Sequence, residues 1–200
     1  MNIKSLLMKI RHFTIGMLCF LCVSCASQMY YGSSGISSRD DAYIGSSAED
    51  LYKTGERYAK GIGTQRNYGK ALAYYNRSAS MGNSDAMYSL GLRYFLGQGV
   101  PQDYNEARAW FEKSAEKNNP YAENQLGFMY NSGKGVAQDY GKGIYWYQRA
   151  ADHGLASAQY NLGLMYLNGI GTPVNKQKAM SLFRQASDRG FLPASRELRT

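Results

Sequence analysis

The stretch YFLGQGVPQDY, residues 94–104, decides the fold because it recurs at a fixed interval along the chain. Its three relatives are YAKGIGTQRNY at 58–68, YNSGKGVAQDY at 130–140 and YLNGIGTPVNK at 166–176. The four stretches are spaced by 36 residues without an insertion, and each carries a tyrosine followed by a pair of glycines. A period of this length is typical of proteins built by repeating one supersecondary unit.

Paired glycines also occur in loops that bind phosphate, but the pattern does not support that interpretation. A single ligand loop has no reason to occur four times in register, and neither of the common phosphate-loop spacings is met. Lys134 has no lysine counterpart, because Ile62, Gln98 and Ile170 hold its position in the other units. We therefore interpret the stretch as a structural turn.

Each unit has the pattern of two amphipathic helices joined by this turn. In residues 84–119, Ala86, Leu90 and Tyr94 recur at the spacing of one helical face. The second half of the unit repeats that spacing at Ala107, Trp110, Phe111 and Ala115. The sequence therefore predicts an all-α chain of stacked helix hairpins.

The expected helix ends carry residues suited to capping. Gly97 ends the first helix, and Asp103 begins the second with Glu106 at the spacing of a capping box. The other units have Asn67, Asp139 and Asn175 at the same starting position. The second helices are expected to end at Gly82, Asn118, Gly154 and Gly190, which accept a left-handed C-terminal cap.

Small and aromatic residues at fixed positions predict how the helices pack. Each of four glycines inside the first helices costs about 1 kcal/mol relative to alanine, so we expect them to permit close backbone approach. These are Gly55, Gly91, Gly127 and Gly163, with expected contacts at Ala71, Ala107, Gly143 and Ala179. We expect Tyr74, Trp110 and Trp146 to fill the space between neighbouring hairpins.

Residues Ala86 to Trp110 carry the pattern A-x-x-x-L-G-x-x-Y-x-x-G-x-G-V-x-x-D-Y-x-x-A-x-x-W, which resembles the Sel-one-like repeat, a relative of the tetratricopeptide repeat. The resemblance covers residues 48–200, with Thr54 and Leu182 as departures in the terminal units. It implies a right-handed α-solenoid whose concave surface serves protein contacts. The expected repeats are 48–83, 84–119, 120–155 and 156–191, with a C-terminal capping helix at 192–200.

The N-terminus has the pattern of an export signal. Lys4, Lys9 and Arg11 precede an apolar stretch of 11 residues, TIGMLCFLCVS, which is too short to span a membrane. The segment CVSC at 22–25 resembles a bacterial lipoprotein box, so we expect residues 1–25 to be the signal and Cys25 to be lipidated. Cleavage after Ala26 is the alternative. Residues 26–47, rich in Gly and Ser, are expected to form a flexible linker.

Charge and cysteine usage exclude several classes of protein. Removing the three basic residues of the signal lowers the formal net charge from +8 to +5, and the remaining Lys and Arg are scattered, so we expect no nucleic-acid partner. The three cysteines, Cys19, Cys22 and Cys25, all lie in the signal. We therefore expect no disulfide, metal site or cofactor in the exported domain.

No motif with catalytic spacing is convincing, so we do not expect an enzyme. His153 is the single histidine after the signal and lies beside an expected helix end, which indicates a solvent-facing turn residue. Ser114 and Lys117 match an S-x-x-K spacing but lack the partner motifs of penicillin-recognising enzymes. Glu112 and Glu116 are typical of a solvated helix face. Asn76 begins a formal glycosylation sequon, which a helix would make a weak signal.

By analogy with tetratricopeptide repeats, the binding surface is expected on first-helix positions that vary between units. The candidates are Asp85, Ser89, Leu92, Leu96, Tyr121, Gln125, Phe128, Ser132, Ser157, Asn161, Leu164 and Asn168. Their mixture of apolar and amide side chains favours an extended peptide or a partner helix. The alternative for Leu92, Phe128 and Leu164 is that they pack in the core.

The leading functional hypothesis is a scaffold or adaptor that binds another protein or a peptide in the bacterial cell envelope. If Cys25 is lipidated in a Gram-negative cell, the resemblance implies a periplasmic protein anchored to the outer membrane, because Ala26 and Ser27 provide no inner-membrane retention signal. Two alternatives remain open. One is a module that binds cell-wall glycan, and the other is a hydrolase such as a beta-lactamase-like relative.

Overall fold

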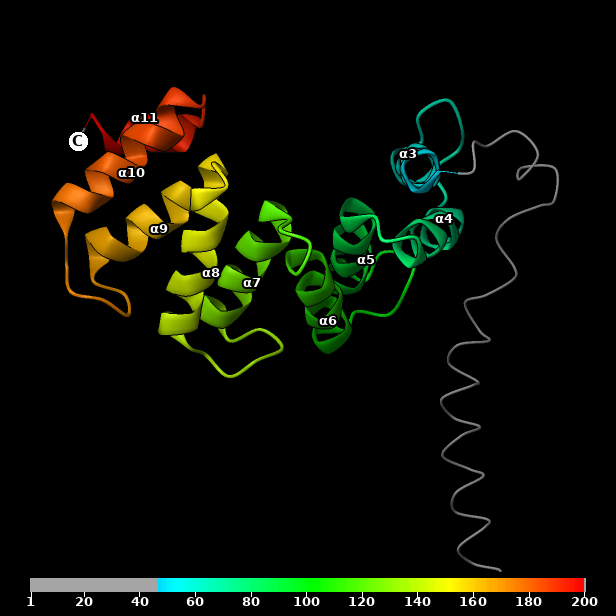
Figure 1. Cartoon of the computed structure of the whole chain (residues 1–200), viewed down its shortest axis with the longest axis horizontal. Helices are drawn as coiled ribbons and strands as arrows, with labels where there is room; N and C mark the ends of the chain where they lie inside the picture. The colour runs from blue at the N-terminus through cyan, green and yellow to red at the C-terminus, as the bar shows by residue number, and fades with distance from the viewer. Residues whose placement is uncertain (1–46, 200) are drawn as a thin grey trace, which may run out of the picture. The chain divides into compact units, whose positions relative to one another are not determined.

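The computed structural model describes residues 47–199, which form nine α-helices and no strand (Figure 1). The helices are α3 (Ala48–Lys60), α4 (Tyr68–Ser80), α5 (Ser84–Leu96), α6 (Tyr104–Ala115), α7 (Pro120–Ser132), α8 (Tyr140–Asp152), α9 (Ala156–Asn168), α10 (Lys176–Asp188) and α11 (Leu192–Glu197). The predicted signal peptide, Cys25 and the linker up to residue 46 lie outside the described residues.

The described helices form four hairpins in tandem, α3/α4, α5/α6, α7/α8 and α9/α10. Each hairpin contacts the next through its second helix, and α11 packs against α10 (Figure 1). One hairpin cannot bury its apolar face alone, whereas a stack of them forms a continuous core. The predicted all-α solenoid of four repeats is thus confirmed.

The helix ends follow the predicted capping chemistry with one exception. The first helices end at Gly61, Gly97, Gly133 and Gly169, all in the left-handed conformation. The Asp103 carboxylate accepts hydrogen bonds from the N–H groups of Asn105 and Glu106, as an N-cap should. The capping box is not closed, because the Asp103 N–H instead donates to the Tyr94 carbonyl at 3.0 Å. The predicted role of Glu106 was therefore wrong.

That backbone bond recurs in every hairpin and explains the repeated tyrosine before the loop. The N-cap N–H groups of Asn67, Asp139 and Asn175 donate to the carbonyls of Tyr58, Tyr130 and Tyr166 at 2.8–2.9 Å. Each loop is thus closed onto the end of the helix that precedes it. The N–H group of the N-cap residue is thereby paired within the hairpin.

The glycines inside the first helices make a closer contact than predicted, with a different partner. A Cβ added to Gly91 would lie 2.5 Å from Phe111 Cε1, so the phenyl ring lies directly on the helix backbone. Gly55, Gly127 and Gly163 meet Tyr75, Tyr147 and Phe183 in the same way. The expected small-residue contacts are secondary, because the aromatic side chain one turn further along the second helix reaches the glycine first.

In the second, third and fourth hairpins, the second glycine of the loop contacts the preceding repeat. A Cβ on Gly99 would lie 2.6 Å from the Cβ of Tyr68, which begins the second helix of the preceding hairpin. Gly135 meets Tyr104 and Gly171 meets Tyr140 in the same register. The G-x-G turn therefore has two separate requirements: the first glycine caps a helix, and the second lets the loop dock on the previous repeat.

Aromatic residues at the predicted interface positions pack as expected in the middle of the array. Trp110 packs against the cluster formed by α3, α4 and α5, and Trp146 packs against the cluster formed by α6 and α7. In the first hairpin, the fully buried Tyr74 stacks on Tyr58 with ring centroids 5.6 Å apart. Trp110 and Trp146 therefore make the core continuous from one hairpin to the next, whereas the stacking of Tyr74 on Tyr58 is within one hairpin.

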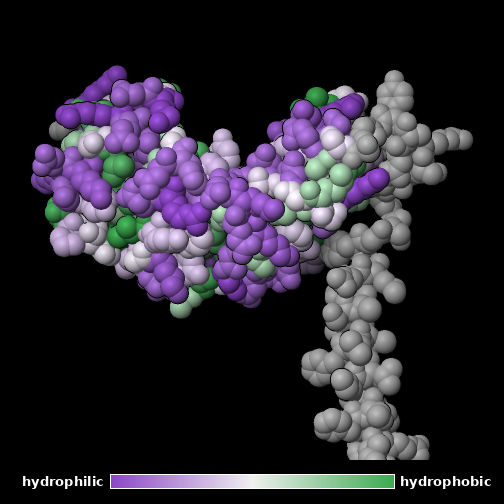
Figure 2. All heavy atoms as spheres, viewed as in Figure 1, coloured by the Kyte–Doolittle hydropathy of each residue, from purple (hydrophilic) through white to green (hydrophobic). Residues whose placement is uncertain are grey.

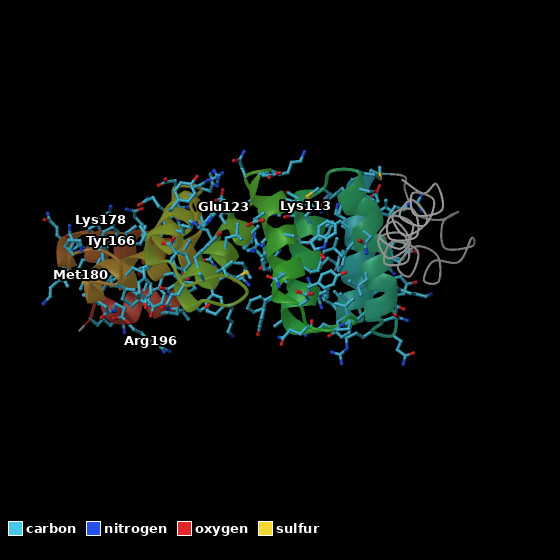
Figure 3. All side chains as sticks on the ribbon, turned by 90° about the horizontal axis from the view of Figure 1, so that it is seen from below. Lys113, Glu123, Tyr166, Lys178, Met180 and Arg196 are labelled. Atoms are coloured by element: carbon cyan, nitrogen blue, oxygen red, sulfur yellow. The ribbon has the colours of Figure 1, made fainter. Side chains whose placement is uncertain are left out.

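The C-terminal end is covered by α11, as predicted for the cap. Ala194 is fully buried, and Phe191 packs with Tyr160 at a ring-centroid distance of 5.4 Å. The Tyr160 hydroxyl donates to Glu197 at 3.4 Å. Arg196 points outward on the exposed side of this short helix (Figure 3). The terminal hairpin is thereby shielded from solvent by a polar end.

Candidate binding surface

The predicted surface residues occupy four positions along each of the first helices of the last three repeats, α5, α7 and α9. Leu96, Tyr121, Ser132 and Asn168 are exposed, and Tyr121 and Leu96 retain 52% and 51% of their surface. Asp85, Leu92, Gln125, Phe128, Ser157, Asn161 and Leu164 are half-buried. Ser89 retains only 4% and lies in the core, so it is removed from the candidate surface.

The three apolar candidates have a packing role as well as partial exposure. Leu92, Phe128 and Leu164 each contact the hydrophobic cluster beneath their helix. The alternative that they belong to the core is therefore correct for part of each side chain. The half that remains accessible is what a ligand could contact.

Amide and carboxylate side chains form short bridges between successive first helices. The Asn119 side chain caps α7 through its oxygen, while its Nδ2 donates to Asp85 Oδ1 at 2.8 Å. Asn83 caps α5 and donates to Glu49 at 3.2 Å in the same way. Asn161 donates to Asn124 Oδ1 at 3.0 Å. The N-cap roles of Asn83 and Asn119 were not predicted, although Asn before a helix is a recognised signal.

The surface is more aromatic than its predicted members indicate. Tyr88 packs against both Tyr121 and Phe111, with ring centroids 5.8 Å apart in each pair. Burial, followed by the neighbouring Tyr121, raises the pKa of the Tyr88 phenol. Tyr88 therefore stays neutral and supplies ring area beside the exposed Tyr121 ring.

A second aromatic group lies at the other end of α5 and α7. Phe95 packs against Tyr104 at a centroid distance of 5.1 Å and against Phe128 at 6.1 Å. The Lys134 ammonium lies 5.7 Å from the Phe95 centroid, 5.8 Å from Tyr104 and 5.6 Å from Phe128. We refer to Phe95, Tyr104, Phe128 and Lys134 as the Lys134 cluster. Each such cation–ring contact at an exposed site contributes about 0.5–1 kcal/mol.

Two features of the fold hold the Lys134 cluster together. Gly133 and Gly135 flank the lysine, and the docking of Gly135 on Tyr104 fixes the loop against the second repeat. The rings come from two hairpins, with Phe95 and Tyr104 in one and Phe128 in the next. Of these residues only Phe128 was predicted. The sequence comparison did show that no other repeat has a lysine at the position of Lys134. Phe95 is also the only aromatic residue at its repeat position, which Ala59, Asn131 and Leu167 hold in the other repeats.

A buried carboxylate lies on the other side of α7, away from the predicted surface residues. Glu123 is fully buried, and its oxygens lie 2.9 Å from Arg149 Nη2 and 2.9 Å from His153 Nδ1, both on α8 or its end. Arg149 also donates to Asn118 in the preceding repeat at 3.2 Å. Figure 3 shows Glu123 within the middle of the array. His153 is thus exposed as predicted but also pairs with a buried acid, which indicates a structural role.

Neither serine motif noted in the sequence presents a reactive group. Ser114 is fully buried, and its hydroxyl donates to the Ser84 carbonyl at 2.7 Å. The serine of the formal glycosylation sequon, Ser78, is also fully buried and donates to the Ala48 carbonyl at 2.5 Å. The two serines occupy equivalent positions and tie the end of a second helix to the start of its partner. Both motifs therefore have a structural explanation.

Within residues 47–199, no group of three or more His, Cys, Asp or Glu side chains is placed to hold a metal ion. The same residues include no helix that is long and apolar enough to cross a membrane. Hydrophilic side chains dominate the face shown in Figure 2, with apolar residues in small separate patches. The described residues therefore suit binding of a ligand by the accessible side chains of the first helices.

Comparison with known proteins agrees with this architecture. The family model for the Sel1 repeat matches residues 48–83, 84–119, 120–155 and 156–191, which are the predicted repeat boundaries. No curated protein matches the chain.

Two solved structures are similar over most of the repeats. The chain is 34% identical to a Sel1 repeat protein from Oxalobacter formigenes, with a TM-score of 0.73 over 76% of this chain and 62% of that one. It is 32% identical to c5321, a protective antigen present in uropathogenic Escherichia coli strains, with a TM-score of 0.70 over 76% of this chain and 32% of that one. The chain therefore spans less than two thirds of the length of either protein.

Proposed function

Because the chain belongs to the Sel1 repeat family, whose members are generally scaffolds for protein interaction, we propose that it binds a partner polypeptide along α5 and α7. The observation that carries the proposal is the set of accessible aromatic and apolar side chains on these two first helices. Tyr121 and Leu96 are exposed, and Phe128 is half-buried. Aromatic side chains near the centre of a surface supply most of the binding energy in protein complexes.

The varied residues on this face suit selective recognition. The position of Tyr121 is held by Glu49, Asp85 and Ser157 in the other repeats. The packing positions, by contrast, repeat as glycine against an aromatic ring in all four hairpins. A face that differs at each level while its scaffold stays constant offers a distinct set of contacts to an extended peptide or a helix.

The test is photo-crosslinking in cells that produce the full chain, with a photoreactive residue at position 121. Tyr145 provides a matched control because it is a tyrosine in the same repeat with a similar exposure, 54% against 52%, but lies on the second helix. We expect a discrete protein adduct from position 121 that is absent from position 145. Identical adducts from both positions, or none from position 121, would contradict the proposal.

We further propose that the scaffold acts in the bacterial cell envelope, exported by its N-terminal signal and anchored to the outer membrane through Cys25. The basic residues, the short apolar stretch and the CVSC segment support this location. The test is metabolic labelling with an alkyne-bearing fatty acid. We expect label on the wild-type chain and none on Cys25→Ala. An unlabelled wild type would favour ordinary cleavage after Ala26, and label that persists in Cys25→Ala would place the fatty acid on another residue.

The exposed ring of Tyr121 favours one second candidate, a module that binds cell-wall glycan. Such a ring can stack on a sugar, and the half-buried amide of Gln125 lies one turn further along the same helix. Sedimentation with purified peptidoglycan tests this candidate. Binding that is lost in Tyr121→Ala but kept in Tyr145→Ala would support it, and no sedimentation of the wild type would exclude it.

A further inference from the structure

From the Lys134 cluster we infer the chemistry of the partner: a polypeptide segment in which an acidic side chain adjoins an apolar one. The acidic group would pair with the Lys134 ammonium, and the apolar side chain would pack on Phe95 and Phe128. This inference rests on the proposed function, because it assigns a ligand class to part of the same surface.

The charge of Lys134 is held in a defined position. Lys134 is exposed, yet its ammonium is held 5.6–5.8 Å from three ring centroids contributed by two hairpins. A lysine normally loses considerable side-chain freedom when it forms an ion pair. Here the rings and the docked loop already restrict the side chain, so an incoming carboxylate would meet a positioned cation.

Within the described part of the chain, the Lys134 ammonium has no acidic partner. No carboxylate lies within ion-pair distance of Lys134 among residues 47–199. Lys142, which also lies over a ring, has Asp139 at 3.9 Å, and Lys178 donates to the Tyr166 hydroxyl at 2.8 Å (Figure 3). An ammonium has three N–H donors, and ring faces provide no conventional acceptor for them. A carboxylate supplies both the charge and the acceptors.

Partly accessible aromatic rings surround the Lys134 charge. Phe95 and Phe128 are half-buried, so part of each ring remains accessible beside Lys134. Apolar contact excludes water next to an ion pair, and reduced screening strengthens the attraction. Neither an isolated acidic residue nor an isolated apolar residue would use both features. The ligand class is therefore the adjacent pair.

The same rings could instead receive a cation of the partner after Lys134 moves away, and this alternative predicts the opposite charge. The two cases separate cleanly in a charge-reversal experiment. Lys134→Glu would repel an acidic segment but would attract a basic one. Lys134→Arg keeps the charge and should preserve recognition of an acidic segment.

The experiment is selection of a randomised heptapeptide library against the intact chain, in wild-type, Lys134→Glu and Lys134→Arg forms. Lys113→Glu is the matched control, because Lys113 is an exposed lysine held over one ring, that of Trp110, at 4.2 Å. We expect the wild type, Lys134→Arg and Lys113→Glu to enrich peptides with Asp or Glu beside an apolar residue. Lys134→Glu should lose that enrichment.

The affinity of one selected acidic peptide for each variant gives the quantitative readout. Lys134→Glu should weaken binding of this peptide about tenfold. A second peptide, in which Gln replaces the acidic Glu, should bind the wild-type protein about fivefold more weakly than the acidic peptide does. Enrichment of basic peptides, equal behaviour of the wild type and Lys134→Glu, or no enrichment at all would each overturn the inference. A protein adduct from position 121 together with any of these results would leave the scaffold function standing while removing the acidic ligand.

Discussion

Gly135 and Gly63 share a backbone conformation, with φ of 69° and 68°, but Gly135 packs against Tyr104 of the preceding repeat whereas Gly63 meets only Arg57 of its own hairpin. The difference follows from position, because no repeat precedes the first one within the described residues. The pair therefore separates the requirement for a left-handed backbone from the requirement for close contact between repeats.

Replacing each of these glycines with alanine measures the two requirements. Both changes should cost about 1–2 kcal/mol for the left-handed conformation. Gly135→Ala should cost a further 1–3 kcal/mol or so, because its Cβ would lie 2.6 Å from the Tyr104 Cβ. Urea unfolding followed by far-ultraviolet circular dichroism provides the measurement. Equal losses for the two variants would show that the contact between repeats contributes nothing.

Gly127→Ala should destabilise the protein even though alanine favours a helix by about 1 kcal/mol. The new Cβ would lie 2.6 Å from Tyr147 Cδ1 in the core, and overpacking of this kind typically costs about 1–3 kcal/mol. Gly69→Ala is the control, because Gly69 is exposed in α4. Its unfolding midpoint should stay level or rise. A rise for Gly127→Ala as well would mean that the ring moves away without cost.

The protein should lose stability when the buried Glu123 loses its partner Arg149. Arg149→Leu removes an ion pair of 2.9 Å and leaves the carboxylate with the half-exposed His153, which should lower the free energy of unfolding by about 2 kcal/mol. Glu123→Met, which copies Met87 of the second repeat, should cost much less.

A double-mutant cycle isolates the interaction, since Arg149 also packs over Trp146 at 5.2 Å. In the Glu123→Met background, Arg149→Leu should cost about 1–2 kcal/mol less than in the wild type. A coupling energy of zero would show that the ion pair does not stabilise the fold. The same urea unfolding assay gives all four free energies.

Stability should fall above about pH 10 because buried tyrosines resist ionisation. Burial raises the pKa of Tyr147, and burial together with Glu56 raises the pKa of Tyr52 to about 12 and that of Tyr75 further. A folded-state pKa raised above the unfolded value gives stability that is complete below the unfolded pKa and is lost as the pH rises through the folded one.

Each such tyrosine should lower the free energy of unfolding by about 1.4 kcal/mol per pH unit above pH 10 or so. Tyr147→Phe removes one ionisable group, so its stability should decline less steeply than that of the wild type. Urea midpoints between pH 8 and pH 11 or so, within this titration range, test the difference. Parallel curves for the two proteins would contradict the assignment of Tyr147 as a neutral core residue.

The fold could be predicted from the sequence because its information is periodic. The 36-residue spacing of the Tyr and Gly positions gave the repeat boundaries, and the caps at Asp103, Asp139 and the left-handed Asn118 followed from local residue chemistry. The side chains that contact the buried glycines were harder to predict. Residue spacing identifies one face of a helix, but not which side chain on that face reaches furthest. Phe111 is longer than Ala107 and takes the contact.

The candidate surface was only partly predictable, because exposure depends on contacts between repeats. Tyr121 and Leu96 are exposed as expected, but Ser89 is buried although its counterparts Gln125 and Asn161 are half-buried. The Lys134 cluster brings together positions from α5, α6, α7 and the loop after α7. No single-helix pattern connects Phe95 with Lys134, 39 residues later, so that grouping required the stacked hairpins.

The docking of each loop on a tyrosine of the preceding hairpin also governs how the array can grow. Tyr68, Tyr104 and Tyr140 each receive the glycine of the following loop, so one hairpin can in principle be duplicated next to another without altering its neighbours. Lys176 holds the equivalent position in the last hairpin, and the short helix α11 follows it. A loop that docked at Lys176 would meet a charged side chain, whereas the loops of the second, third and fourth hairpins each meet a tyrosine.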